Sequence, residues 1–172
     1  ALNVWVWAML GVTSSPPDER YHAVRLCIMS MHILVGALFL LRAPVRRGGS
    51  TADILAAVPA IVLSGSAFAS APSCAAWHPV AVGLFIVGTA IALVSMITLA
   101  RNFAVLPAVR GVSSTGPYRL IRHPLYFGEL MLVAACAVAS TSLLSTVIVL
   151  ATLVAVIWRI RSEEKLLQSI PA

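Results

Sequence analysis

The chain has 172 residues, of which 60% are hydrophobic and only 10% are charged. Soluble domains carry about 25% charged residues, so this composition excludes a soluble globular fold. The net charge of +6 does not indicate nucleic-acid binding, because the basic residues lie at the ends of apolar stretches rather than in a basic run. We therefore predict an all-α fold, a polytopic bundle of helices in a membrane.

The first part of the chain predicts one membrane span. Residues 1–12 are apolar but too short to cross, and Trp5 and Trp7 suit an interfacial position. A truncated extra span is the alternative for this segment. Residues 26–41 begin just after Arg25 and contain no charge, and they form the first predicted span.

The middle of the chain predicts two further spans. Residues 54–100 contain no Asp, Glu, Lys or Arg, and these 47 residues are too many for one span of about 20. Turn-forming residues gather at positions 70–79 and divide the stretch. The resulting spans lie near 54–70 and 79–100.

The last uncharged run, residues 130–158, is either one long tilted helix or a hairpin bent near Ser140–Ser142. The positive-inside rule favours the hairpin, because it collects ten of the twelve basic residues on one side, which is then cytoplasmic. The ten are Arg42, Arg46, Arg47, Arg101, Arg110, Arg119, Arg122, Arg159, Arg161 and Lys165. We predict about five spans, the last two forming a short hairpin.

The segment Gly-Pro-Tyr-Arg-Leu-Ile-Arg-His-Pro-Leu-Tyr-Phe, residues 116–127, is the most polar stretch of the chain. Pro124 suits the first position of a helix, whose free N–H groups attract a carboxylate or phosphate. Arg122 and His123 stand beside this helix start as donors. Tyr118 and Tyr126 offer aromatic faces for an adenine ring or a sulfonium.

A second polar cluster, residues 159–165, closes the last apolar run. Arg159 and Glu163 are four residues apart and share a helix face. Glu163 or Glu164 can accept hydrogen bonds from ribose hydroxyls or from an ammonium. Together the two clusters suit S-adenosylmethionine and, in part, a nicotinamide dinucleotide. The simpler alternative is that the arginines only orient the protein and that Arg159 and Glu163 form a solvated pair.

These motifs, in their order along the chain, resemble those of the isoprenylcysteine carboxyl methyltransferase family and of the related membrane phospholipid methyltransferases. The elements are Arg101-Asn-Phe, Gly116-Pro-Tyr-Arg, Arg122-His-Pro-Leu-Tyr-Phe-Gly128 and Arg159 followed by Glu163-Glu164, and the resemblance covers about residues 80–168. It implies a membrane-embedded, non-Rossmann fold that binds S-adenosylmethionine from the cytosol.

The resemblance also implies roles for particular residues. The matching cofactor-binding positions are Tyr118, Arg122, His123, Pro124, Tyr126, Glu163 and Glu164. The arginine that the family ties to the reaction corresponds to Arg159, with Arg161 as second choice. Family members commonly continue into a tyrosine-containing tail, so we expect part of the acceptor site to lie beyond the sequence given.

Other polar residues lie within the apolar runs. Glu129 falls in the first turns of the fourth span, where a carboxylate is costly, and we predict a catalytic or acceptor-binding role; the alternative is a hydrogen-bonded interfacial residue. His32 is expected to be a packing residue. The three cysteines have no metal-ligand spacing, and we predict no metal site.

We predict a single integral membrane domain, with N-terminal spans over residues 1–78 and a cofactor-binding catalytic core over 79–172. The predicted reaction is O-methylation of a carboxylate on an isoprenylcysteine-like, lipophilic or prenylated acceptor. Methylation of a phospholipid amine or of a thiol, an NADPH-dependent membrane reductase, and a non-enzymatic transporter or scaffold are the alternatives. Expected partners are the acceptor and membrane lipids, with no nucleic acid and no obligate protein.

Overall fold

The structure is a computed structural model that describes residues 19–41, 43–44, 47–48, 50–103, 108–109 and 115–168. Residues 1–12, for which we predicted an interfacial segment or an extra span, lie outside the described residues. The helices are α2 (Glu19–Leu41), α3 (Thr51–Ala69), α4 (Pro79–Leu99), α5 (Pro124–Ser140) and α6 (Leu143–Gln168). Three short 3-10 helices are η1 (Cys74–Ala76), η2 (Ala100–Asn102) and η3 (Gly116–Arg119), and β1 (Arg47–Gly48) pairs antiparallel with β2 (Ala108–Val109).

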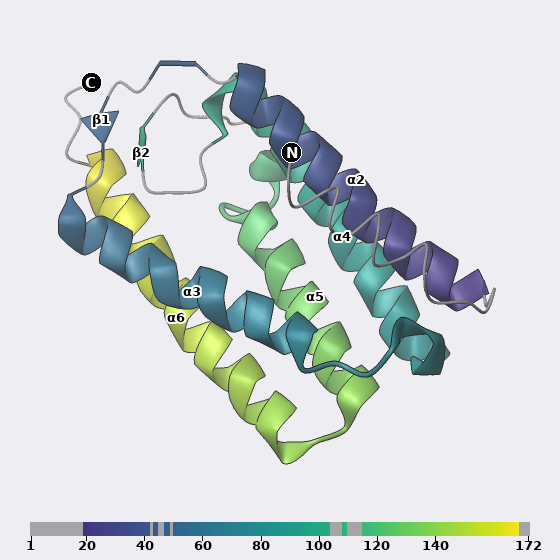
Figure 1. The fold of residues 1–172 in the computed structure, drawn as a ribbon. Coiled ribbons are helices and arrows are strands. Elements are labelled where there is room, and N and C mark those ends of the chain that lie inside the picture. Colours follow the sequence, from purple (N-terminus) through teal and green to yellow (C-terminus); the bar gives the residue numbers. More distant parts are fainter. Residues whose placement is uncertain are drawn as a thin grey trace.

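The helices confirm the predicted polytopic bundle. Four of them, α2, α3, α4 and α6, are long and apolar enough to cross a membrane, and α5 is a shorter apolar helix of 17 residues. Successive helices run in opposite directions, so the end of α2, the start of α3, the end of α4, the start of α5 and the end of α6 gather at one end of the bundle (Figure 1). We call this end the polar end, because both polar clusters lie there.

The last apolar run folds as the predicted hairpin. Helix α5 ends at Ser140, and its C-cap Thr141 takes up a left-handed conformation with φ 49°. The backbone N–H of Ser145 then donates to the Ser142 hydroxyl at 3.1 Å in the first turn of α6. Helix α6 continues past the apolar run to Gln168, and this extension carries Arg159 and the Glu163-Glu164 pair to the polar end.

Helices α4 and α5 pack closely because two glycines meet at their crossing. A Cβ atom on Gly128 would lie 2.9 Å from the backbone oxygen of Gly88, and one on Gly88 would lie 2.9 Å from the Cβ of Met131. Neither position accepts a side chain without a shift of the helices. Gly128, the glycine of the RHPLYFG motif, thus fixes the start of α5 against α4.

The opposite end of the bundle is apolar and well packed. Trp77 is fully buried, and its ring meets that of Phe85 edge to face at a centroid distance of 5.4 Å. The indole N–H donates to the carbonyl of Pro72 at 3.0 Å, which leaves this buried group satisfied. Buried Cys136 and partly buried Cys27 and Cys74 belong to the same cluster as apolar filler.

Helices α2 and α3 attach to different partners. Helix α2 packs against α4, whereas α3 packs mainly against α6 and in part against α5. Figure 1 shows α2 and α3 on the two sides of α5. This arrangement leaves a cavity between them, described below.

Candidate functional site

The first polar group links the start of α5 to the end of α6. The Arg122 Nη1 donates to Glu164 Oε1 at 3.3 Å, and His123 Nε2 lies 3.2 Å from the same oxygen. His123 is the N-cap residue of α5, but its side chain makes no cap hydrogen bond because it turns toward Glu164. Buried Pro124 occupies the first helical position, as predicted.

The second group lies deeper, on the same two helices. The Tyr126 hydroxyl donates to Glu163 Oε1 through a short hydrogen bond, and Arg159 Nε donates to that oxygen at 3.4 Å. The Arg159 guanidinium carbon also lies 4.9 Å from the centre of the Tyr126 ring. Arg159 is only 6% exposed, so the alternative of a solvated helix-surface pair is wrong. Arg161 is exposed, as expected for a residue about 200° round the helix from Arg159.

Tyr118 of η3 is partly buried and feels the charge of Glu163 in the second group. Burial and, to a smaller extent, the negative charge of Glu163 together raise the pKa of Tyr118 to about 12. The phenol therefore stays protonated at neutral pH and can serve as a hydrogen-bond donor. Since a phenol loses its proton only near this pKa, we expect no charge change at Tyr118 between about pH 5 and 9.

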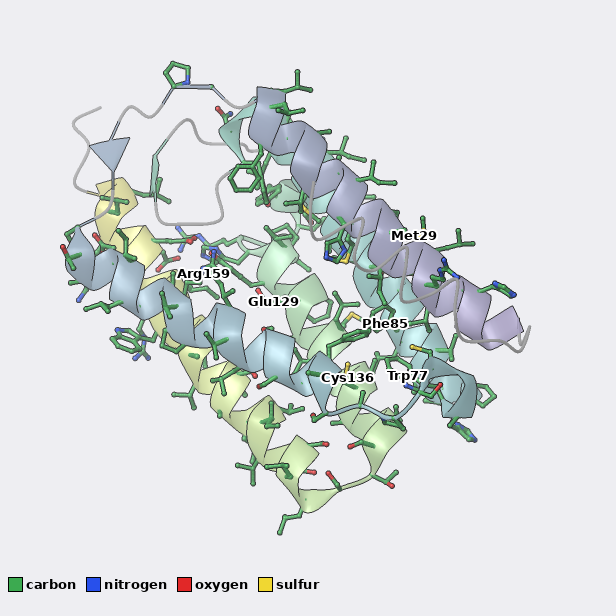
Figure 2. All side chains as sticks on the ribbon, viewed as in Figure 1. Met29, Trp77, Phe85, Glu129, Cys136 and Arg159 are labelled. Atoms are coloured by element: carbon green, nitrogen blue, oxygen red, sulfur yellow. The ribbon has the colours of Figure 1, made fainter. Side chains whose placement is uncertain are left out.

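Glu129 lies one turn below Tyr126 on α5. The Ser64 hydroxyl of α3 donates to Glu129 Oε1 at 2.7 Å, so α3 supplies a partner for the intramembrane carboxylate. A hydrogen-bond partner for Glu129 agrees with both interpretations of this residue, and its role stays a prediction. In Figure 2, Glu129 and Arg159 lie toward the polar end, away from Cys136, Phe85 and Trp77.

Helix α3 makes a second polar contact that sequence reasoning missed. Ser162, beside Glu163 on α6, donates to Asp53 Oδ1 at 2.5 Å. Asp53 also accepts from the backbone N–H of Ser50 at 2.8 Å in a capping box that starts α3. The Ser-x-x-Asp pattern at Ser50 and Asp53 is typical of a helix start, but it does not indicate the contact with α6.

A cavity of about 530 Å³ lies below these groups, between α2, α3, α4 and α5. Its walls are mainly apolar, with four polar or charged side chains besides Tyr126: His32, Ser64, Glu129 and Arg159. The apolar lining residues are Ile28, Met31, Val35, Ile61, Gly65, Phe68, Phe85, Ala92, Met96, Phe103, Leu125, Leu132, Val133 and Cys136. Its size and lining suit part of a lipid-like molecule.

The cavity and the polar groups share Tyr126 and Arg159. Both residues contact Glu163 on one side and line the cavity on the other. By contrast, Tyr118, Arg122, His123 and Glu164 do not line it. The geometry thus separates a polar compartment at the end of the bundle from an apolar compartment within it, with Arg159 and Tyr126 at the boundary. Among the described residues, no group of three or more His, Cys, Asp or Glu side chains is arranged to hold a metal ion.

A bundle of apolar helices with a polar cluster at one end and a mainly apolar cavity beneath it defines the class of the protein, an integral membrane protein. A profile of the phospholipid methyltransferase family matches residues 77–170, which include both polar clusters. The chain belongs to this family, and it is a membrane methyltransferase. No curated protein and no solved structure matches it.

Proposed function

We propose that the protein transfers a methyl group from S-adenosylmethionine to the polar end of a lipophilic acceptor held in the cavity. The observation that carries this proposal is the position of Arg159 and Tyr126, which belong to the polar cluster and also line the apolar cavity. A methyl donor on one side and an acceptor on the other would meet at this boundary.

The polar compartment has the donor set that S-adenosylmethionine needs. Arg122, His123 and the uncapped start of α5 would hold its carboxylate, and Glu163 or Glu164 would accept from its ammonium or ribose hydroxyls. The rings of Tyr118 and Tyr126 would face the adenine or the sulfonium. When bound, the cofactor supplies a methyl group on a cationic sulfur.

The acceptor would enter from the membrane. The cavity is lined by residues of α2 and α3, which pack against different helices, and its lining is mainly apolar. A lipid chain moving between these helices would not cross water. Because the chain would pass from one apolar environment to another, this transfer would gain little hydrophobic free energy, and the head group would have to supply most of the specificity.

The charges in the cavity favour a zwitterionic head group with an amine. Arg159 offers one cation and Glu129 one anion, and both line the same space. Arg159 would bind a phosphate and Glu129 an ammonium. A carboxylate acceptor, the reaction we predicted from the sequence, is the second candidate because it would also bind Arg159. It is less favoured because it would add a third carboxylate beside Glu129 and Glu163.

The same proposal includes orientation and domain organisation. The end of the bundle that holds both clusters also holds most of the basic residues that the structure describes, which supports a cytoplasmic active site. Residues 79–172 would then form the cofactor-binding core, and the spans within 1–78 would supply much of the acceptor cavity. Cysteine labelling from outside intact cells at position 119 or 161 should fail; successful labelling would reverse the orientation.

Two measurements test the reaction. Calorimetric titration of purified protein should show binding of S-adenosylhomocysteine and none of NADPH; the opposite result would favour a reductase. Methyl transfer from radiolabelled S-adenosylmethionine should then be compared in lipid nanodiscs containing phosphatidylethanolamine or N-acetyl-S-farnesylcysteine. Transfer to the amine lipid supports the favoured acceptor, transfer to the carboxylate probe supports the second, and transfer to neither would refute the proposal.

A further inference from the structure

His32 lies near the middle of α2 and lines the acceptor cavity. The sequence predicted a packing residue. In the structure, however, the imidazole borders the same space as Glu129 and Arg159, and α2 lies outside the segment matched by the family. An ionisable side chain at this depth is costly unless it has a function.

The hydrogen bonds of the imidazole determine what it can do. His32 Nδ1 lies 2.8 Å from the carbonyl oxygen of Ile28. A carbonyl can only accept, so Nδ1 must carry the proton. In the neutral imidazole, Nε2 then has a lone pair, and no described residue is its hydrogen-bond partner. The ring can accept a proton at Nε2 while Nδ1 continues to donate to Ile28, which stabilises the resulting cation.

We infer that His32 Nε2 accepts a proton from the amine of the methyl acceptor. This inference rests on the proposed function and assigns a further catalytic residue to it. An ammonium has no lone pair, so one N–H bond must break before the nitrogen can form its new bond to carbon. The proton goes to His32 Nε2, and the electron pair of the broken N–H bond remains on nitrogen. That pair would form the bond to the methyl carbon, and the carbon–sulfur bond of the donor would break with its electron pair going to the departing sulfur.

Glu129 is less suited to take this proton. Its carboxylate accepts the hydroxyl hydrogen of Ser64 at 2.7 Å and would hold the ammonium by charge. If Glu129 became protonated, this attraction would be lost. The other titratable or charged residues that line the cavity are Tyr126, whose hydroxyl donates to Glu163, Cys136 in the apolar cluster, and Arg159. Among the described lining residues, His32 is therefore the best proton acceptor.

The variant His32→Gln tests this role because glutamine can accept a hydrogen bond but cannot take up a proton. In nanodiscs, we expect transfer to phosphatidylethanolamine to fall on the order of 100-fold. Transfer to N-acetyl-S-farnesylcysteine, whose carboxylate has no proton to lose, should fall little if the protein accepts this probe. Affinity for S-adenosylhomocysteine should be unchanged. His78→Gln is the matched control, because His78 is exposed at the opposite end of the bundle.

A second measurement needs no cofactor and no turnover. The ¹⁵N resonances of the His32 imidazole should shift when short-chain phosphatidylethanolamine is added, and not when phosphatidylcholine is added, because its quaternary ammonium has no N–H. If wild-type protein methylates phosphatidylethanolamine and His32→Gln does so at the same rate, only this inference is overturned. If wild-type protein methylates neither probe, the proposed function is overturned as well.

Discussion

Helices α4 and α5 approach so closely that a Cβ atom on Gly128 would lie 2.9 Å from a backbone oxygen of Gly88, whereas α2 and α3 leave a cavity of about 530 Å³ beside α5. The tight interface lies within the segment matched by the family, and α2 and α3 lie outside it. This difference in packing gives the two regions different roles. The close packing fixes the polar residues at the start of α5, and α2 and α3, which pack against different helices, leave room for a lipid-like molecule.

The largest effect is expected at Arg159, which lies at the boundary between the polar compartment and the apolar cavity. Arg159→Ala should reduce methyl transfer on the order of 100- to 1,000-fold, because a buried cation that orients the acceptor is lost. Affinity for S-adenosylhomocysteine should stay nearly intact, since other residues would hold the cofactor. Arg159→Lys should restore only part of the rate, because lysine cannot form two parallel hydrogen bonds with one anion.

Arg161→Ala is the matched control for this variant, because Arg161 is exposed on the same helix. Single-turnover rates and calorimetric titration would separate chemistry from binding. A larger loss in Arg161→Ala than in Arg159→Ala would contradict the placement of Arg159 at the reaction centre.

The next prediction concerns the tight interface between α4 and α5. Gly128→Ala should destabilise the protein by roughly 1–3 kcal/mol, because the added methyl group meets backbone atoms that cannot move independently. Gly83→Ala is the control, since a Cβ atom at Gly83 of α4 would have no atom within 4 Å. Thermal unfolding in detergent should show a lower midpoint only for Gly128→Ala. Equal midpoints for the two variants would show that α4 and α5 can separate at little cost.

Much of the fold and of the polar clusters could be predicted from the sequence. Apolar run lengths, turn residues and the basic residues predicted the spans and the hairpin. The Arg122-His123-Pro124 motif and the Glu163-Glu164 pair indicated two clusters that meet, and the structure joins them through Glu164. These features depend on local sequence and on the membrane as solvent, which is why they could be predicted.

The cavity could not be predicted in the same way. Helices α2 and α3 are apolar on all sides, so hydrophobic periodicity does not separate faces that contact lipid from faces that line a cavity. Ser64 and His32 were visible only as isolated polar residues in apolar runs. Their proximity to Glu129 or to the cavity depends on contacts between distant segments, and a single sequence contains no direct signal of those contacts.

Substitution of the proposed cofactor-binding residues should reduce cofactor affinity moderately. Glu163→Ala and His123→Ala should each weaken binding of S-adenosylhomocysteine by roughly 1–3 kcal/mol, because each leaves a polar partner unpaired. Lys165→Ala, at an exposed position of the same helix, should leave binding unchanged. Calorimetric titration measures all three variants. Wild-type affinity in both Glu163→Ala and His123→Ala would exclude these side chains from the cofactor pocket.

The smallest effect is expected when the cavity alone is changed. Gly65 of α3 lines the cavity, and a Cβ atom there would have no atom within 4 Å, so Gly65→Leu should fill space without straining the fold. The acceptor would then lose part of its site, and its KM should rise by about tenfold or less, equivalent to about 1.4 kcal/mol. Affinity for S-adenosylhomocysteine should not change, because the polar compartment is untouched. Gly36→Leu is the matched control: Gly36 lies on α2, has equally open space around its Cβ position, and does not line the cavity. Initial rates at varied acceptor concentration in mixed micelles would give both KM values. A rise in both variants would point to a general disturbance of the apolar helices, and a rise in neither would place the acceptor outside the space between α2 and α3.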